Sequence, residues 1–178
     1  MPIRFDAGEV ITAMVTPMDE KREIDYNKTE LLAKHLIDNG SDAVLVCGTT
    51  GESPTLTHEE EAELISTVKR ACANRAKVIA GAGSNSTETA VMSAKTAQKE
   101  EVDAILSVVP YYNKPSQRGM IEHFSAIAEA VDLPIILYNI PSRTGFTMQP
   151  QTVAYLAGKY DNILALKQSC PNLAMVSE

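Results

Sequence analysis

Apolar residues recur along the chain in short continuous runs, and longer segments with helical spacing separate these runs. The runs that predict strands lie at residues 10–18, 42–48, 77–83, 103–110, 134–141 and 162–169. The segments that predict helices lie at residues 26–40, 57–74, 86–100, 117–131 and 149–160, and a last helix is expected after Cys170. Successive strands begin roughly 30 residues apart, which is the length of a βα unit. Continuous apolar runs, rather than alternating ones, favour a parallel sheet with both faces covered.

Six βα units predict either a doubly wound sheet or most of a (β/α)₈ barrel of the TIM type. The residues after the strands distinguish the two. Polar segments follow every predicted strand, namely "TPM", "GTTGES", "GAGSNS", "PYYNKP", "YNIPSRTG" and "KQSC". A dinucleotide-binding domain would concentrate its signal in a glycine-rich first turn, and the first turn here has no glycine. The α/β class with a barrel architecture is therefore favoured.

Composition limits the function classes. The chain has 178 residues, 44% of them apolar, and a net charge of −7. The acidic balance argues against nonspecific binding of nucleic acid or of an anionic membrane surface. Three cysteines without paired spacing suggest reduced thiols and a cytoplasmic protein. The three histidines are scattered along the chain, so we expect no metal site.

Lys167 and Tyr138 are the main candidates for chemistry. Lys167 ends an apolar strand, where burial would favour the neutral amine and allow it to form a Schiff base with a ketone. Tyr138 ends the preceding strand, where its phenol could move protons. Each has a purely structural alternative, since a lysine can extend from a strand end to solvent and a buried tyrosine is often a core residue.

Other polar residues follow the same strand ends. Arg143 could bind a substrate carboxylate, although a solvated loop arginine is equally compatible with its position. Tyr111 and Tyr112 lie between two prolines and are expected to contact another subunit or enter a pocket. Thr49 and Thr50 lie between two glycines. One end of the sheet would thus carry an amine, two phenols, paired hydroxyls and a guanidinium, a set that suits carbonyl chemistry through an imine.

The motifs "GTTGES", "PYYNKP", "YNIPSRTG" and "ALKQS", in this order and spacing, resemble those of the class I, Schiff-base-forming family of pyruvate-dependent aldolases and lyases. The resemblance covers essentially the whole chain. It implies that Lys167 forms the imine with pyruvate and that Tyr138 is the proton donor and acceptor. It also implies that Thr49 relays protons, and that Tyr112 enters the site from a neighbouring subunit.

The resemblance further implies that Thr50 binds the pyruvate carboxylate and that Arg143 binds the second substrate. An arginine at position 143 favours the branch that condenses pyruvate with L-aspartate 4-semialdehyde in lysine and diaminopimelate biosynthesis. No cofactor is expected beyond the covalent imine on Lys167. The alternatives are a related aldolase that acts on longer keto acids, such as an N-acetylneuraminate lyase, or a barrel fragment without activity.

Many members of this family are inhibited by lysine at a subunit interface, and Ser53, His58, Asn85 and Tyr111 match positions of that site. Apart from the resemblance, His58 and Asn85 are expected to be helix-start residues. The acidic residue usual in the lysine site falls at Thr89 here. We therefore expect weak or absent inhibition by lysine.

The family's barrel has eight strands and a C-terminal helical extension, whereas this sequence ends shortly after its sixth predicted strand. We interpret residues 1–178 as a single barrel domain that lacks strands seven and eight and the extension. The chain would then be a fragment, be completed by a second chain that supplies the remaining units, or pair with copies of itself. A homo-oligomer, dimeric or tetrameric, is the assembly that the resemblance implies.

Overall fold

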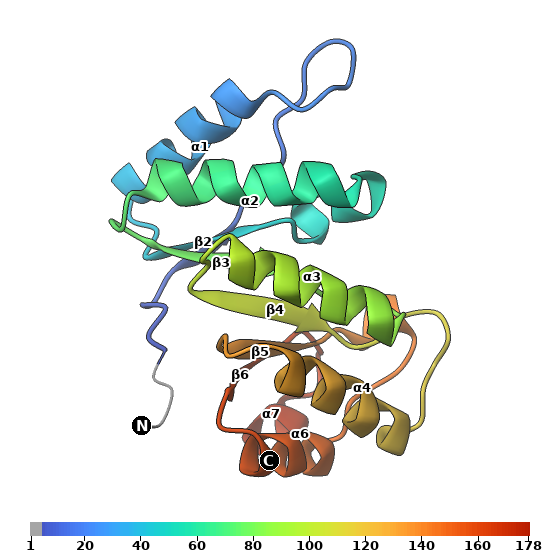
Figure 1. Ribbon diagram of the computed structural model, residues 1–178. Coiled ribbons are helices and arrows are strands. Elements are labelled where there is room, and N and C mark those ends of the chain that lie inside the picture. Colours follow the sequence, from blue (N-terminus) through green and yellow to red (C-terminus); the bar gives the residue numbers. More distant parts are fainter. Residues whose placement is uncertain (1–4) are drawn as a thin grey trace. The chain divides into compact units, whose positions relative to one another are not determined.

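The computed structural model describes residues 5–178, in which six strands alternate with helices along the chain (Figure 1). The strands are β1 (Ile11–Ala13), β2 (Ala43–Val46), β3 (Lys77–Gly81), β4 (Ala104–Val108), β5 (Ile135–Asn139) and β6 (Ile163–Gln168). The helices are α1 (Tyr26–Asp38), α2 (His58–Cys72), α3 (Thr87–Lys99), α4 (Gln117–Ala130), α5 (Pro141–Thr144), α6 (Pro150–Lys159) and α7 (Leu173–Ser177). Two 3₁₀ turns, η1 (Thr49–Gly51) and η2 (Ser53–Thr55), follow β2.

Every predicted strand and helix is present, and two helix ends show well-defined local features. Thr57 and Glu60 form a reciprocal capping box at the start of α2. Gly40, just after α1, has a φ of 96°, a conformation that glycine adopts without steric cost. The first strand is shorter than predicted, because regular pairing stops at Ala13 and Met18 instead pairs antiparallel with Ile24. The sequence did not predict α5, η1 or η2.

The described chain divides into two compact units. An N-terminal unit comprises residues 5–81 and 96–104, and a C-terminal unit comprises residues 82–95 and 105–178. The division passes through α3 and β4. None of the helices in residues 5–178 is both long enough and apolar enough to cross a lipid bilayer.

In the N-terminal unit, β2 pairs in parallel with both β1 and β3. The register places Ala43 opposite Ile11 and opposite Lys77. Helices α1 and α2 lie side by side next to these strands (Figure 1). Val44 on β2, and Leu64 and Val68 on α2, are almost completely buried. Apolar burial between the helices and the strands is therefore the main source of stability of this unit.

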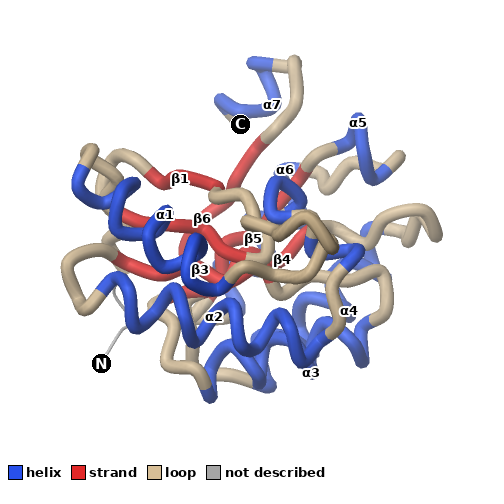
Figure 2. The backbone as a smooth tube through the Cα atoms, turned by 90° about the horizontal axis from the view of Figure 1, so that it is seen from above, coloured by secondary structure: helices blue, strands red, loops and turns tan. Residues whose placement is uncertain are grey.

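In the C-terminal unit, β5 pairs in parallel with both β4 and β6. Figure 2 shows the strands in red and the helices in blue; α4 and α6 contact each other, and α6 contacts β6. The core contains Phe124 and Ile127 from α4, Ile135 and Leu137 from β5, and Leu156 from α6. Burial of these apolar side chains stabilises the unit.

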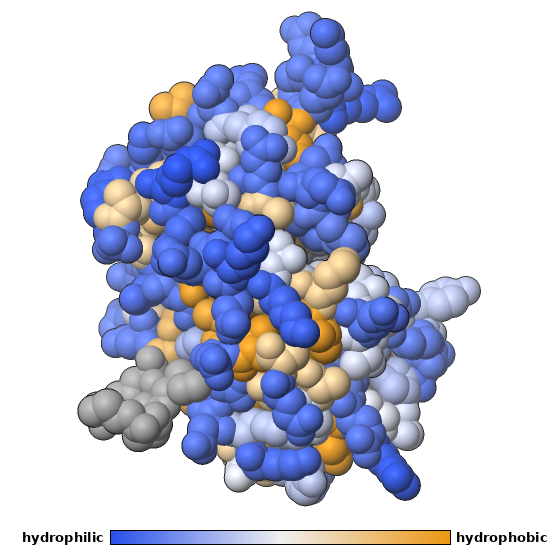
Figure 3. Space-filling model, in the orientation of Figure 1, coloured by the Kyte–Doolittle hydropathy of each residue, from blue (hydrophilic) through white to orange (hydrophobic). Residues whose placement is uncertain are grey.

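Strand β6 is less covered than β5. Most of the face seen in Figure 3 is polar, with apolar residues gathered near the middle of the view. On β6, Leu164 and Leu166 are each 39% exposed, whereas Ile163 is buried. The reason is that β6 pairs with β5 on one edge, and within residues 5–178 no strand pairs with its other edge.

Gly81, at the end of β3, allows a close approach to the segment after β2. A Cβ atom added at Gly81 would overlap the carbonyl oxygen of Cys47. Cys47 itself has a φ of 55°, in the left-handed region that residues with a side chain seldom adopt. Cys47, which has the strained backbone, is thus held against Gly81, which lacks a side chain. Cys47 directly precedes the segment Gly48–Gly51.

His123, on α4, is a buried histidine with one unsatisfied ring nitrogen. Its Nδ1 lies 2.9 Å from the hydroxyl of Thr87 at the start of α3. Its Nε2 has no hydrogen-bond partner among the described residues. The ring packs edge-on against Phe124. Burial lowers the pKa of His123 from 6.5 to about 4.

We predict that replacing Gly81 with alanine destabilises the protein by about 3 kcal/mol, the upper end of the range for overpacking, because the new methyl group meets backbone atoms. Gly158→Ala is the control. Gly158 lies in helix α6, and an added Cβ there meets nothing within 4 Å among the described residues outside its own stretch of helix. The substitution should therefore stabilise the protein by up to about 1 kcal/mol. Urea unfolding measures both variants. Equal stability of the Gly81 variant and the wild type would contradict the close approach.

We predict that His123 makes the stability dependent on pH in the acid range. The unfolded chain binds a proton at this residue below pH 6.5, whereas the folded chain does so only below about pH 4. The contribution is therefore fully present above pH 6.5 and is lost as the pH falls toward 4, by roughly 3 kcal/mol at most.

Urea unfolding of the wild type and of His123→Gln at several pH values between 4 and 7.5 measures this dependence. The variant should show a smaller loss of stability over that range. The matched control is His35→Gln, since His35 is an exposed histidine on α1. Parallel pH profiles for the wild type and His123→Gln would refute the prediction.

Candidate active site

The predicted site residues are divided between the two units. Thr49 and Thr50 belong to the N-terminal unit, and Tyr112, Tyr138, Arg143 and Lys167 belong to the C-terminal unit. Each group is described within its own unit.

In the N-terminal unit, Thr49 and Thr50 open the turn η1 and both are exposed. The turn is fixed by backbone bonds, because the N–H of Gly51 donates to the carbonyl oxygen of Gly48 at 2.9 Å. The buried hydroxyl of Thr16 donates to the carbonyl oxygen of Gly51 at 2.6 Å. Both threonines are therefore exposed on a backbone that is held in place.

In the C-terminal unit, Lys167 and Tyr138 lie together. They occupy paired positions on β6 and β5, so their side chains lie on the same face of the strand pair. The Nζ atom of Lys167 lies 4.2 Å from the centroid of the Tyr138 ring. This is a cation–π contact, in which the negative face of the ring attracts a positive charge.

The expected burial of Lys167 is wrong for this structure, since the residue is exposed. The four apolar residues before it predicted an interior position, but three of them, Leu164, Ala165 and Leu166, are exposed as well. Their exposure has the same cause, namely the unpaired outer edge of β6. Tyr138 is half-buried.

Arg143 and Tyr112 lie on two loops that contact each other. Arg143 is exposed in the short helix α5, and the next residue, Thr144, is buried. The N–H of Tyr112 donates to the carbonyl oxygen of Thr144 at 3.3 Å. Tyr112 is 90% exposed and has a φ of 71°. The strained backbone of Tyr112 therefore directs a large aromatic side chain into solvent, beside the turn that carries Arg143.

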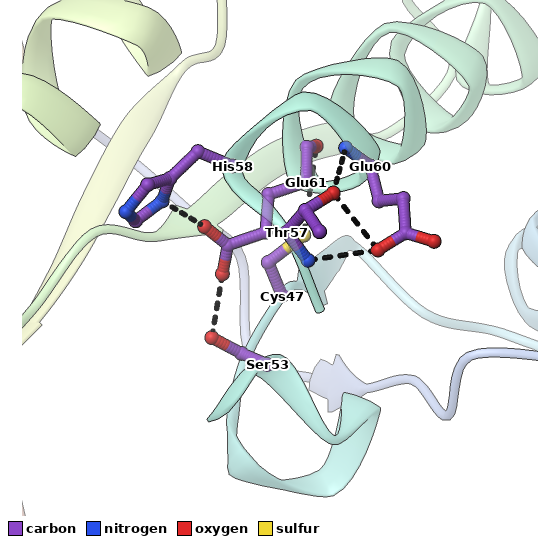
Figure 4. A network of polar contacts seen from close by, with 6 residues as sticks. All are labelled: Cys47, Ser53, Thr57, His58, Glu60 and Glu61. Carbon is purple, nitrogen blue, oxygen red and sulfur yellow. Dashed lines mark hydrogen bonds and ion pairs between the residues drawn. The ribbon is translucent and has the colours of Figure 1, made fainter. Parts of the chain in front are cut away.

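The residues matched to a lysine site have local partners. The carboxylate of Glu61 accepts a hydrogen bond from the Ser53 hydroxyl at 2.7 Å, and its other oxygen lies 3.1 Å from Nδ1 of His58 (Figure 4). His58 is the first residue of α2, as the capping interpretation expected. In the C-terminal unit, the carbonyl oxygen of Asn85 accepts a bond from the side chain of Asn113, and Tyr111 is 39% exposed.

Two polar residues next to the site were missed by the sequence analysis. Asn139 follows Tyr138 and is buried, and Gln168 follows Lys167. The sequence did contain a signal for Asn139, because a polar amide within the apolar run "PIILYNIP" predicts a buried, hydrogen-bonded side chain. Such a residue must find hydrogen bonds in the interior.

Comparisons with known proteins agree with the motifs. The model of the dihydrodipicolinate synthetase family matches residues 6–178. The 4-hydroxy-tetrahydrodipicolinate synthase of Synechococcus sp. (strain JA-2-3B'a(2-13)) is 54% identical over 96% of this chain, which spans 56% of that protein.

Solved structures show the same relationship. A dihydrodipicolinate synthase from Cyanidioschyzon merolae with lysine bound has a TM-score of 0.93 and 54% identity over 95% of this chain. A synthase from Acinetobacter baumannii complexed with pyruvate has a TM-score of 0.93 and 40% identity over 96% of this chain. The chain spans 58% of each of these structures.

This likeness confirms the predicted α/β fold class of the TIM-barrel type. The family model covers nearly the whole sequence, and the identity to a named relative exceeds one half. On these grounds the chain belongs to the dihydrodipicolinate synthetase family.

Proposed function

We propose that this chain carries the catalytic lysine of a lyase that condenses pyruvate with L-aspartate 4-semialdehyde to 4-hydroxy-tetrahydrodipicolinate. The observation that carries the proposal is the pairing of Lys167 with Tyr138, with Nζ 4.2 Å from the ring centroid. Membership of the family and the names of the relatives support it. The chain spans 56–58% of the relatives described above, and the reaction is proposed for the protein to which these residues belong.

The chemistry follows from an amine beside a phenol. The neutral amine of Lys167 attacks the keto carbon of pyruvate, and loss of water gives an imine. The protonated imine withdraws electrons, so the methyl group of pyruvate loses a proton and becomes a nucleophilic enamine. The enamine attacks the aldehyde carbon of the second substrate and forms the new carbon–carbon bond. Hydrolysis of the imine and cyclisation then free the lysine, and the bound imine takes the place of a cofactor.

Tyr138 is the proposed proton donor and acceptor for these steps. A phenol next to the reacting carbon can protonate the departing hydroxyl and later accept a proton. Its ring face also suits the positive charge of the protonated imine. Tyr138 is half-buried, and its ring lies beside the Nζ atom of Lys167.

The proposal also gives roles to four further residues, namely Thr49, Thr50, Arg143 and Tyr112. The exposed hydroxyls of Thr49 and Thr50 are proposed to relay protons and to bind the pyruvate carboxylate, respectively. Arg143, also exposed, is proposed to bind the carboxylate of the second substrate. Tyr112 is proposed to enter the site of a neighbouring copy in a dimer or tetramer, which its 90% exposure permits. We also propose a cytoplasmic location, because the three cysteines are unpaired.

A protein without catalytic activity is the second candidate, and the exposure of Lys167 favours it. An amine in contact with water lacks the dehydrated surroundings that promote imine formation. Binding of pyruvate through a covalent bond separates the two candidates.

We predict that borohydride reduction in the presence of pyruvate attaches one pyruvate to Lys167. Peptide mass spectrometry locates the adduct, and Lys167→Arg should abolish it. The matched control is Lys159→Arg, because Lys159 also lies over a tyrosine ring, that of Tyr160, at 4.9 Å. If folded wild-type protein gains no adduct, the proposed lyase function is refuted and the candidate without catalytic activity is supported.

We predict that Tyr138→Phe separates binding from proton transfer. The variant keeps the ring face beside Lys167 but loses the hydroxyl, so pyruvate should still be trapped, at a lower rate. Turnover in the assembled enzyme should fall by roughly 10²–10⁴-fold, the usual contribution of general acid–base catalysis. Unchanged turnover would remove Tyr138 from the proposed proton transfers.

We predict weak or absent inhibition by millimolar lysine. Thr89 cannot supply a carboxylate to the ammonium group of an inhibitor, and both carboxylate oxygens of Glu61 already have partners in Ser53 and His58. The rate of pyruvate trapping or of turnover, with and without lysine, measures the effect. Thr89→Glu should increase the inhibition. Strong inhibition of the wild type would refute the prediction.

A further inference from the structure

Asn139 is a buried amide at the last position of β5 and is 1% exposed. Its Oδ1 accepts a hydrogen bond from the N–H of Met148 at 3.1 Å. Its Nδ2 donates to the carbonyl oxygen of Met148 at 3.2 Å and to Oε1 of Gln168 at 3.0 Å. The buried amide is thus satisfied by one backbone position and one side chain.

Gln168 is the last residue of β6 and lies opposite Asn139 in the strand pairing. Its Oε1 accepts the bond from Asn139, and its Nε2 faces two sulfur atoms, Sγ of Cys170 at 2.9 Å and Sδ of Met175 at 3.4 Å. Sulfur is a weak acceptor. The bond from Asn139 is therefore the main polar contact of the Gln168 side chain.

These two amides join three segments that carry proposed site residues. Asn139 directly follows Tyr138, and Gln168 directly follows Lys167. Met148 ends the stretch that begins with α5, where Arg143 lies. The two amides therefore fix the ends of β5 and β6 relative to each other and to the loop of Arg143.

The strand pairing alone does not fix this alignment. The register of β5 with β6 shifts between Ile135 and Ile136, which lie opposite Ile163 and Ala165. Leu164 is the extra residue of a bulge. Without that shift Tyr138 would lie opposite Leu166, and the side chain of Lys167 would point to the other face. The bond between Asn139 and Gln168 forms only in the observed register.

We propose that Asn139 and Gln168 are positioning residues, which hold the amine of Lys167 opposite the ring of Tyr138 by fixing the register of β5 and β6. The proposal rests on the function proposed above, but its test also has a readout that does not depend on imine formation.

The test compares two variants of Gln168 that differ in one property. Gln168→Met is close in size but has no oxygen to accept the bond from Asn139. Gln168→Glu keeps an acceptor at the same distance along the side chain. The rate of pyruvate trapping is measured against pyruvate concentration for both. Gln168→Met should lower the maximal rate roughly tenfold or more, because small misplacements of reacting groups are costly, with little change in the half-saturating concentration. Gln168→Glu should stay close to the wild type.

Asn162→Leu is the control for loss of a buried amide. Asn162 precedes the opposite end of β6, and its Nδ2 donates to the carbonyl oxygens of Ala128 and Val131. This variant should lose stability in urea but keep the maximal trapping rate. Equal losses of rate in Gln168→Met and Gln168→Glu, or none in Gln168→Met, would overturn the proposal.

Hydrogen exchange gives the second readout. The N–H of Ser169 donates to the carbonyl oxygen of Asn139 at 2.9 Å, and the N–H of Met148 donates to its side chain. Both amides should exchange faster in Gln168→Met than in the wild type or in Gln168→Glu. If the wild type traps no pyruvate, the proposed function fails, and the exchange rates alone decide whether the two amides fix the register.

Discussion

The register between β5 and β6 is the constraint on which the candidate site depends. It places Tyr138 opposite Lys167 and Asn139 opposite Gln168, so that one pair of side chains can face a substrate while the other pair closes the strand ends behind it. Side chains alternate between the two faces of a strand, and a slip of one residue would exchange these roles. The bulge at Leu164 therefore determines that Lys167 lies on the same face as Tyr138.

A comparable constraint acts on the turn after β2. The strained backbone of Cys47 and the missing side chain of Gly81 allow the chain to turn sharply into Gly48–Gly51. Burial raises the pKa of the Cys47 thiol well above its usual range, and the thiol contacts the carbonyl oxygen of Glu61. Cys47 is thus a packed, unreactive residue whose importance lies in its backbone conformation. Thr49, Thr50 and Arg143 are exposed, and each of these two segments is followed by a buried residue, Gly51 or Thr144.

The sequence predicted the order of elements well, because the apolar runs and the helical spacing between them are local signals. It did not predict α5, since four residues are too few to show helical periodicity. It also missed the bulge at Leu164, because the pattern "NILALKQS" fits a regular strand equally well. The burial of Lys167 was overestimated for a related reason. An apolar run shows that a strand is suited to an interior, but the elements packed beside it and on its faces decide how much of it is covered.

The charge of the chain bears on how it would attract its proposed substrates, which are both carboxylates. The net charge of −7 repels anions at long range. Salt screens charges over about 8 Å at physiological ionic strength, so groups near the site outweigh the total charge there. Lys167, within β6, and Arg143, in α5 just after β5, are exposed basic residues of the C-terminal unit. Their exposure leaves both side chains accessible to an anionic keto acid. The same exposed lysine therefore suits the first encounter with pyruvate better than the bond-forming step, which requires water to be excluded from around the amine.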